Sequence, residues 1–347
     1  MWKMRKRRPG PGCAVWEITL RCNLNCIHCG SAAGKARPDE LTTEESLDLC
    51  NQLKGIQCKG VAMMGGEPLT RPDWPIIAKH IKKLKMDLSI ITNGFFQNPE
   101  IFDEIIDIKP ELVSVSLDGG RAKTHDKIRG VSGSFERALS TINRFVDAGM
   151  PTSVITTVHK MNLSELKLIR NILLGKGIAW QIQMAAPFGR LTREYVLSPE
   201  EFYSVGMFIA ASQKQFSNNK IMVAGAHDMG YYARLLPHLQ VAPWRGCSAG
   251  IGTLGIQSNG NIQGCLALPD EFIEGNIRET PLKDIWESKE FSSYSRQVRQ
   301  SDLGGACISC EHRAICKGGC SAVSHSMSGE LHRDPYCLRK IEIDLNL

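Results

Sequence analysis

Residues 21–30 read Arg-Cys-Asn-Leu-Asn-Cys-Ile-His-Cys-Gly, and this stretch decides the fold and the chemistry of the chain. It follows a strand-like segment, AVWEITL at residues 14–20, and it contains Cys22, Cys26 and Cys29 in a C-x3-C-x2-C pattern. Three thiolates this close can ligate three irons of a cubane iron-sulfur cluster. Because no fourth cysteine lies in the loop, one iron would be left open. For three cysteines alone, the alternatives are a partial zinc site and buried thiols without a metal.

From residue 14 to about residue 213, strand-like and helix-like segments alternate and form six βα units. The strands are expected at AVWEITL, GVAMM, DLSIIT, ELVSVSL, TSVITTV and AWQIQMA, and the helices from Thr43, near Trp74, near Pro99, after Ser134, after Asn162 and after Ser198. Capping signatures mark three helix starts, at Thr42 with Glu45, Asn162 with Glu165, and Ser198 with Pro199 and Glu201. Parallel strands joined by helices close into a barrel or wind into an open sheet. In both folds the ligand site lies at the carboxyl ends of the strands.

After about residue 215 the alternation fades, and from Trp244 the sequence is rich in glycine and cysteine with short strands. Asn259-Gly260, flanked by β-forming residues, predicts a hairpin turn. We therefore expect four parts: a basic tail at residues 1–13, the βα domain at 14–215, a bridging segment at 216–244, and a smaller domain at 245–347 that is organised by metal.

The composition excludes several classes of protein. Hydrophobic residues make up 42% and charged residues 22% of the 347 residues, and no apolar run approaches the roughly 18 residues of a membrane span. The charge of +6 comes almost wholly from Lys3, Arg5, Lys6, Arg7 and Arg8, so the folded body is nearly neutral. We expect neither a nucleic-acid partner nor a membrane protein. The basic tail is either a solvated end or a dock for an acidic peptide or redox partner.

The cysteines indicate metal or catalytic chemistry. Pro-Gly-Pro-Gly and a strand follow the basic tail, where a signal peptide would have an apolar segment, so a cytoplasmic location is expected. Thirteen cysteines in a cytoplasmic chain are not a disulfide framework, because a reducing compartment keeps thiols free. Cys50 and Cys58 are expected to pack as small apolar residues, and Cys13 has no assigned role.

Polar motifs follow the second, third and fourth expected strands. Gly65-Gly66-Glu67-Pro68 combines glycines, which permit close backbone approach, with a carboxylate that can accept from an ammonium group. The next strand ends at Thr92-Asn93-Gly94, and the fourth ends with Ser114, Ser116 and Asp118. The segment His125-Asp126 to Arg129 comes after it. Taken singly, these motifs could be turn chemistry or a surface salt bridge.

Together the cysteine loop and these motifs resemble the radical S-adenosylmethionine (radical SAM) superfamily. The resemblance implies that SAM chelates the open iron of a [4Fe-4S] cluster and is cleaved to a 5'-deoxyadenosyl radical. It implies that Gly65, Gly66, Glu67 and Pro68 lie at the amino group of SAM, and that Thr92, Asn93, Ser114, Ser116 and Asp118 contact its ribose and carboxylate. His28 would lie near adenine, and Arg129 would clamp the carboxylate.

A second cysteine pattern resembles the seven-cysteine SPASM signature, which binds two auxiliary [4Fe-4S] clusters. It comprises Cys247, Cys265, Cys307, Cys310, Cys316, Cys320 and Cys337. The resemblance assigns Cys307, Cys310, Cys316 and Cys337 to an outer cluster, and Cys247, Cys265 and Cys320 to an inner one. Paired zinc-ribbon spacing fits the gaps poorly. The expected architecture is α/β: a partial (β/α)6 TIM-type barrel with a C-terminal SPASM domain and three [4Fe-4S] clusters in all.

The inner set lacks a fourth cysteine. Family members with full cysteine ligation carry one about six residues after the first, where this chain has Thr253. The vacant iron could bind a substrate thiolate or take an electron through a direct ligand, or a water or side chain could close it.

The resemblance also bears on the substrate, since SPASM proteins mostly modify peptides or proteins. The segment around the cysteine loop is most similar to mycofactocin-type and haem-pathway maturases. Leu266 follows Cys265 where anaerobic sulfatase-maturing enzymes have aspartate, which disfavours that activity. Only 21 residues precede Cys22, so a leader-binding domain there is not expected. We expect a precursor-peptide substrate, a separate small protein that captures its leader as an added strand, and flavodoxin or ferredoxin as electron donor.

Two other hypotheses stay open: a tetrapyrrole maturase that abstracts hydrogen from a propionate side chain, and a zinc-binding protein without catalysis. The acid or base that serves the substrate is not identified. Glu17 is a weak candidate if it faces the barrel lumen, and a buried structural carboxylate is the alternative. His227, Asp228, Tyr231 and Tyr232 lie in the bridging segment, where a substrate could pass, although packing is the simpler role.

Overall fold

Seven parallel strands form the body of the molecule. The computed structural model describes residues 8–96, 98–216 and 221–347. The strands are β1 (Cys13–Thr19), β2 (Gly60–Gly65), β3 (Asp87–Thr92), β4 (Leu112–Ser116), β5 (Thr152–Val158), β6 (Ala179–Met184) and β7 (Met222–Gly225), each hydrogen-bonded to the next in chain order. The six expected strands are confirmed. β7, which also pairs in parallel with β6, is an additional strand in the segment expected to be a bridge.

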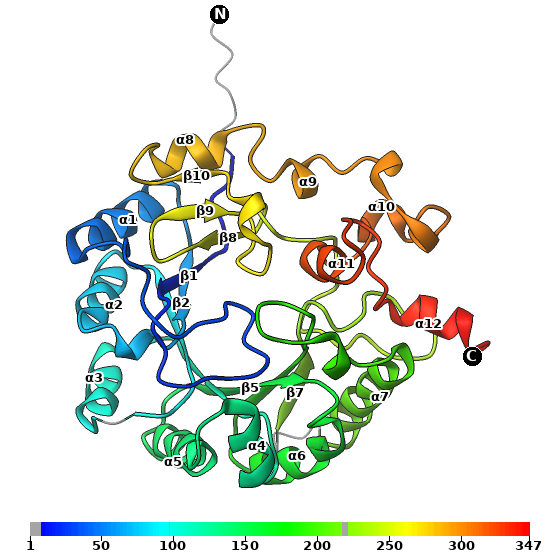
Figure 1. The fold of residues 1–347 in the computed structure, drawn as a ribbon, viewed down its shortest axis with the longest axis horizontal. Coiled ribbons are helices and arrows are strands. Elements are labelled where there is room, and N and C mark those ends of the chain that lie inside the picture. The colour runs from blue at the N-terminus through cyan, green and yellow to red at the C-terminus, as the bar shows by residue number, and fades with distance from the viewer. Residues whose placement is uncertain (1–7, 97, 217–220) are drawn as a thin grey trace, which may run out of the picture.

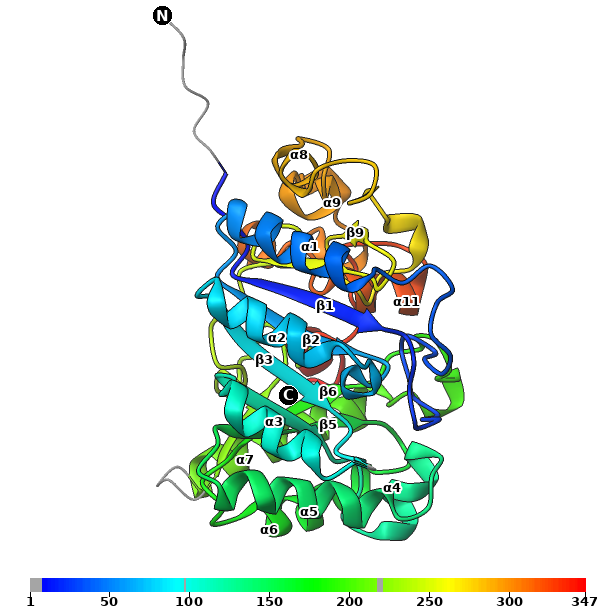
Figure 2. The ribbon, with the colours of Figure 1, turned by 90° about the vertical axis from the view of Figure 1, so that its left-hand side faces the viewer.

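Helices cover the outer face of these strands and curve the sheet into a partial barrel (Figure 1). They are α1 (Thr43–Gly55), α2 (Trp74–Lys83), α3 (Glu100–Ile108), α5 (Ser134–Asp147), α6 (Leu166–Leu173) and α7 (Pro199–Gln215). A helix absent from our expectation, α4 (Ala122–Arg129), lies toward the end to which the strands point (Figure 2). Single 3-10 turns occur at Pro68–Thr70, Leu163–Glu165, Arg193–Tyr195, Asp270–Phe272, Gln300–Asp302 and Gly305–Cys307.

The alternation of side chains along each strand separates an apolar face from a polar one. In β4, Val113 and Val115 are fully buried in the core shared with the helices. Ser114 points to the opposite face, where its hydroxyl lies 2.7 Å from that of Ser153 on β5. Because successive strand residues face opposite sides, the polar residues gather inside the barrel.

Two of the three capping predictions are confirmed. Thr42 with Glu45 and Ser198 with Glu201 both form reciprocal capping boxes. The prediction for Asn162 with Glu165 is wrong. The Asn162 amide donates instead to the carbonyls of Asp118 (2.9 Å) and Thr157 (3.0 Å), so it joins two strand ends, and α6 begins three residues later than a cap at Asn162 requires.

The C-terminal region extends the same sheet. β8 (Thr253–Ile256) pairs in parallel with β1, β9 (Asn261–Gln263) pairs antiparallel with β8, and β10 (Gly275–Asn276) pairs antiparallel with β9. The turn predicted at Asn259-Gly260 is confirmed, and Gly260 has a φ of +88°. The remaining helices are α8 (Leu282–Glu287), α9 (Ser293–Arg296), α10 (Arg313–Cys316), α11 (Ser321–Ser328) and α12 (Leu338–Asp344). The ten-stranded sheet therefore runs in the order β10-β9-β8-β1-β2-β3-β4-β5-β6-β7.

Within the described ranges, no helix combines the length and the apolar character that crossing a membrane requires.

The pairing of β8 with β1 predicts that the barrel does not fold well alone. A fragment of residues 1–244 would leave one edge of β1 unpaired and would remove Leu254 and Ile256 from the core. We expect this fragment to aggregate, or to unfold without a cooperative transition, in size-exclusion chromatography and urea titration followed by circular dichroism. A monomeric fragment that unfolds cooperatively would contradict the dependence.

Candidate functional site

The cysteine loop follows β1 at the carboxyl ends of the strands. The Cys22 amide donates to the Gly34 carbonyl (2.9 Å), while the amides of Asn25 and Ile27 donate to the carbonyls of Arg129 (3.1 Å) and Ile128 (2.9 Å). The last turn of α4 therefore fixes the middle of the loop. The structure thus explains why the segment ending at Arg129 matters to the cysteines.

The three sulfurs already receive hydrogen bonds of the kind that ligand thiolates accept. The amides of Leu24 and Ala33 donate to the sulfurs of Cys22 and Cys29, each at 3.4 Å. Arg129 Nη1 lies 3.7 Å from the sulfur of Cys26. Burial raises the pKa of Cys22 to about 11, so this thiol stays protonated unless a metal displaces the proton.

The donor set fits a cluster better than a single ion. Within the described residues, no three His, Cys, Asp or Glu side chains converge closely enough to share one metal ion. Ligands of a cubane bind different irons and do not need to meet at one point. Cys22, Cys26 and Cys29 could therefore hold a [4Fe-4S] cluster.

The loop after β2 passes very close to the cysteine loop. A Cβ atom on Gly66 would lie 2.2 Å from the Arg21 carbonyl oxygen, and one on Gly65 would lie 2.2 Å from that of Thr19. Only glycine fits at these positions. The Glu67 amide donates to the Arg21 carbonyl at 2.8 Å, so the two loops are joined directly. Pro68 is buried and begins a 3-10 turn.

Thr92 and Asn93 hold the Glu67 carboxylate. Thr92 Oγ1 donates to Glu67 Oε1 (2.9 Å) and the Asn93 amide donates to Glu67 Oε2 (2.7 Å). Burial raises the pKa of Glu67 to about 7, although these hydrogen bonds act to lower it. The resemblance implies that Thr92 and Asn93 contact SAM, which stays a prediction. In the structure their polar groups orient the carboxylate that would receive an ammonium group.

Asp118 is the centre of a buried ion-pair cluster. Its Oδ2 lies 2.6 Å from Arg129 Nη2 and 3.2 Å from His28 Nε2, and its Oδ1 accepts from the Thr157 amide at 2.8 Å. Burial alone would raise the pKa of Asp118, but Arg129 and His28 hold it well below its usual range. The ion pair offsets part of the cost of burying both charges.

Several buried polar atoms face this region without a partner. They are Nδ1 of His28, Nε of Arg129 and Nε2 of His159. The His28 and His159 rings lie 5.6 Å apart. Unpaired buried donors and acceptors are costly, so they indicate a polar ligand at this position. Ser116, two residues before Asp118, is half-buried. Ser114 lies two residues earlier on the same face of β4, and its hydroxyl already contacts that of Ser153.

Sequence reasoning missed Arg190, which clamps the cysteine loop. Its Nε donates to the Cys26 carbonyl (2.8 Å) and its Nη1 to the Ala33 carbonyl (2.7 Å). A Cβ on the preceding Gly189 would lie 2.3 Å from the Cys29 carbonyl oxygen. His159, which follows β5, was also missed. Neither residue belongs to a local motif, so only their position after a strand end could have suggested them.

The C-terminal cysteines gather in two groups. Burial raises the pKa of Cys320, and the neighbouring Cys247 and Cys265 raise it further. Burial likewise raises the pKa of Cys316 to about 12, with Cys337 and Cys307 as its charged neighbours. A pocket is lined by Cys307, Cys310, Cys316 and Cys337 together. This grouping fits one four-cysteine cluster and one three-cysteine cluster.

Residues of the bridging segment lie between the barrel and these groups. Tyr231 and Asp334 form a short hydrogen bond beside the Cys320 amide. Asp228 is buried after β7; its Oδ2 accepts from the Met184 amide at 3.2 Å, and its Oδ1 has no partner. His227 is exposed, and Tyr232 stacks on His312 with ring centres 4.1 Å apart.

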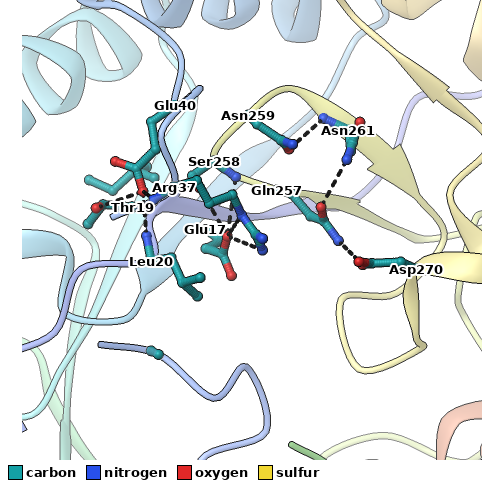
Figure 3. A network of polar contacts seen from close by, with 12 residues as sticks. Glu17, Thr19, Leu20, Arg37, Glu40, Gln257, Ser258, Asn259, Asn261 and Asp270 are labelled. Carbon is teal, nitrogen blue, oxygen red and sulfur yellow. Dashed lines mark hydrogen bonds and ion pairs between the residues drawn. The ribbon is translucent and has the colours of Figure 1, made fainter. Parts of the chain in front are cut away.

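Glu17 joins the barrel to the C-terminal hairpin. Its Oε1 accepts from Arg37 (3.0 and 3.2 Å) and from the amide (3.3 Å) and hydroxyl (3.1 Å) of Ser258. Figure 3 shows this carboxylate between Arg37 and Ser258, with Glu40 bound to Thr19 and Leu20 beside it. These partners fit the structural alternative for Glu17.

Comparison with families of known proteins identifies two regions. The model of the radical SAM superfamily matches residues 16–172, and that of SPASM, an iron-sulfur cluster-binding domain, matches residues 247–311. The AdoMet-dependent haem synthase of Methanosarcina barkeri is 33% identical, over 94% of this chain and 96% of that protein. The mycofactocin maturase MftC of Mycobacterium tuberculosis is 29% identical, over 95% of this chain and 83% of that protein.

Solved structures share the fold. SuiB of Streptococcus suis bound to S-adenosylmethionine has a TM-score of 0.77 at 20% identity and covers 95% of this chain and 77% of SuiB. The structure of native anSMEcpe with bound AdoMet has a TM-score of 0.73 at 16% identity and covers 96% of this chain and 97% of anSMEcpe. Both likenesses extend over the barrel and the C-terminal region.

The Arg190 clamp predicts a specific loss of iron. In Arg190→Lys the charge stays, but one ammonium cannot reproduce the two-point contact with the loop carbonyls. We expect iron in the anaerobically reconstituted protein to fall by up to one cluster, about 4 atoms per chain. Arg193→Lys is the matched control, because Arg193 contacts exposed carbonyls at Ser326 and Met327. Equal iron in Arg190→Lys and the wild type would refute the clamp.

The Glu17 contacts predict a loss of stability. Glu17→Ala removes a buried carboxylate with a partly exposed Arg37 partner, so the free energy of unfolding should fall by about 1–3 kcal/mol. Urea unfolding under anaerobic conditions measures it, with the exposed Glu44→Ala as control. Unchanged stability combined with lost substrate conversion would instead mark Glu17 as catalytic.

Proposed function

Because this chain belongs to the SPASM-containing branch of the radical SAM superfamily, we propose that it cleaves S-adenosylmethionine reductively and abstracts a hydrogen atom from a peptide substrate. The observation that supports this proposal is the three-cysteine loop at the strand ends, with the unpaired buried nitrogens of His28 and Arg129 beside it. When bound, the cluster and SAM supply a 5'-deoxyadenosyl radical.

In this proposal Cys22, Cys26 and Cys29 hold the cluster that binds SAM. The fixed Glu67 carboxylate receives the amino group of SAM, as do the backbone groups of Gly65, Gly66 and Pro68 around it. Thr92 and Asn93 orient Glu67. Arg129 is held by Asp118 and offers its free Nε to the SAM carboxylate. His28 borders the adenine, and Ser116 and Ser114 line the polar interior.

Two auxiliary [4Fe-4S] clusters complete the proposed cofactor set. The outer one uses Cys307, Cys310, Cys316 and Cys337, which line one pocket. The inner one uses Cys247, Cys265 and Cys320. Three clusters would give about 12 iron atoms per chain. Zinc in place of iron after anaerobic reconstitution would support the non-catalytic alternative and reject the radical reaction.

A ribosomally made precursor peptide is the proposed substrate. Its support is the similarity to mycofactocin maturase along nearly the whole chain and the peptide substrates of most SPASM proteins. A separate leader-recognition protein and a flavodoxin or ferredoxin would be the partners. The reaction could form a crosslink, epimerise, decarboxylate or excise part of a residue.

A haem-pathway substrate is the second candidate. It is favoured by the similarity to haem synthase. That protein is more identical to this chain than mycofactocin maturase is, and the similarity covers 96% of it. Both candidates share the same radical step and differ in the molecule that gives up the hydrogen atom.

The test is anaerobic incubation with SAM and dithionite, following 5'-deoxyadenosine and the mass of the added substrate. Candidate peptides encoded beside the gene, with their small recognition protein, form one arm. A porphyrin with propionate side chains forms the other. A mass change only in the porphyrin arm would reject the peptide substrate, and no 5'-deoxyadenosine in either arm would reject the radical reaction.

Asp228 is the proposed substrate-facing acid or base, because its Oδ1 is buried and unpaired beside the end of β6. With the substrate identified above, Asp228→Asn should keep 5'-deoxyadenosine formation and lower product formation by about 10²–10⁴-fold. Product and 5'-deoxyadenosine are quantified in the same reaction, and His227→Asn is the neighbouring control. An equal fall in product and in 5'-deoxyadenosine would mean that Asp228 affects folding or the SAM site instead.

A further inference from the structure

Around the inner cysteine set, some side-chain hydroxyls already donate their hydrogen to a protein acceptor, and others do not. Thr253, which occupies the position where relatives carry a fourth cysteine, donates its hydroxyl to the Ser248 carbonyl at 3.1 Å. Ser292 donates its hydroxyl to Glu274 at 3.1 Å, and Ser295 bonds to the Ala249 carbonyl. None of these three hydroxyls has a free hydrogen to offer a cluster.

Tyr294 lies against the same segments. α9, on which it sits, is tied to the loop after Cys247, because Arg296 Nε donates to the Gly250 carbonyl at 2.6 Å. A Cβ on Gly264 would lie 2.3 Å from the Tyr294 hydroxyl oxygen. The phenol oxygen is therefore packed directly on the residue that precedes Cys265.

The Tyr294 hydroxyl has no hydrogen-bond partner although it is buried. The Ser292 hydroxyl lies close enough to act on the Tyr294 phenol, but the Ser292 hydrogen goes to Glu274. A buried phenol usually finds an acceptor, because a buried donor without a partner is destabilising. This phenol therefore faces a position where an acceptor belongs.

Two cysteines of the inner set lie close to that position. Cys265 directly follows Gly264, and Cys247 lies three residues before Gly250, whose carbonyl accepts from Arg296 of α9. The ring is fixed from behind by Phe272, edge-on at 5.4 Å, and Phe272 also packs on His325 of α11 at 5.2 Å. α11 begins directly after Cys320, so Phe272 links the Tyr294 ring to the helix that follows the third cysteine of the inner set.

We propose that the Tyr294 hydroxyl donates a hydrogen bond to a sulfur of the cluster held by Cys247, Cys265 and Cys320. The inference rests on the proposed function, which places a cluster there. A neutral phenol is a donor, and cluster sulfurs are negatively charged acceptors. Hydrogen bonds to these sulfurs raise the reduction potential, because they stabilise the added electron. Tyr294 thus positions and tunes the inner cluster without ligating it.

Ser321 is the rival residue. It follows Cys320 directly, and its hydroxyl is also buried without a partner. Its short side chain emerges from the first turn of α11 rather than from the segments around Cys265. It provides a matched comparison, because Ser321→Ala and Tyr294→Phe each delete one unpaired buried hydroxyl.

The experiment measures reduction potentials in anaerobically reconstituted full-length protein. Replacing Cys22, Cys26 and Cys29 with alanine leaves the two auxiliary clusters, and an added Cys247→Ala change identifies the signal of the inner one. Iron content, electron paramagnetic resonance and redox titration are compared for the parent, Tyr294→Phe, Ser321→Ala and Tyr232→Phe. Tyr232 is a control, because its hydroxyl already donates to the Trp244 carbonyl at 3.0 Å.

We expect Tyr294→Phe to keep its full iron content and to shift only the inner cluster to a more negative potential. Ser321→Ala and Tyr232→Phe should leave that potential unchanged. An unchanged potential in Tyr294→Phe, a shift in Ser321→Ala alone, loss of inner-cluster iron in Tyr294→Phe, or a parent without an inner cluster would each overturn the proposal. SAM cleavage by the wild type is scored separately, so failure of the proposed function is recognised independently.

Discussion

β1 is hydrogen-bonded on both edges, and the rest of the structure depends on this shared strand. It pairs with β2 of the barrel on one side and with β8 of the C-terminal region on the other, both in parallel. Its carboxyl end leads into the loop with Cys22, Cys26 and Cys29. A single strand therefore fixes the position of the first cysteine loop relative to the later cysteines, which are more than two hundred residues away in sequence. The Glu17 contact with Ser258 lies on the same strand and strengthens this connection.

Electrostatics and burial shape the region around that loop. The Asp118 carboxylate, fully buried, holds Arg129 and His28, and Arg129 in turn contacts the sulfur of Cys26. A buried charge without its partner would cost several kcal/mol, so each of these groups constrains the others. These ion-paired side chains leave two buried nitrogens without a partner, Nδ1 of His28 and Nε of Arg129. That pattern is what a polar ligand requires of a preorganised site.

The bridging segment contributes buried polar groups. Asp228 has an unpaired oxygen, while Tyr231 lies with Asp334 of the C-terminal region beside both the outer and the inner cysteine groups. Burial raises the pKa of Asp334 to about 7. The bridging segment is therefore more than a linker, because it contributes β7 to the sheet and buried polar groups beside the later cysteines.

The sequence by itself determined the features that depend on local spacing. The six βα units, the capping boxes at Thr42 and Ser198 and the turn at Asn259-Gly260 follow from periodicity and backbone preferences that act within a few residues. The close spacing of Cys22, Cys26 and Cys29 likewise indicated a cluster, whereas the two auxiliary clusters were implied by the resemblance of the later cysteines to the SPASM signature. The contacts of Asn162, His159, Arg190, Asp228 and Tyr294 became visible only in the folded chain. Each of these residues meets a segment distant in sequence, as Arg190 does at the Cys26 carbonyl. No local pattern records such a contact, because it arises only when the strands bring their carboxyl ends to one edge.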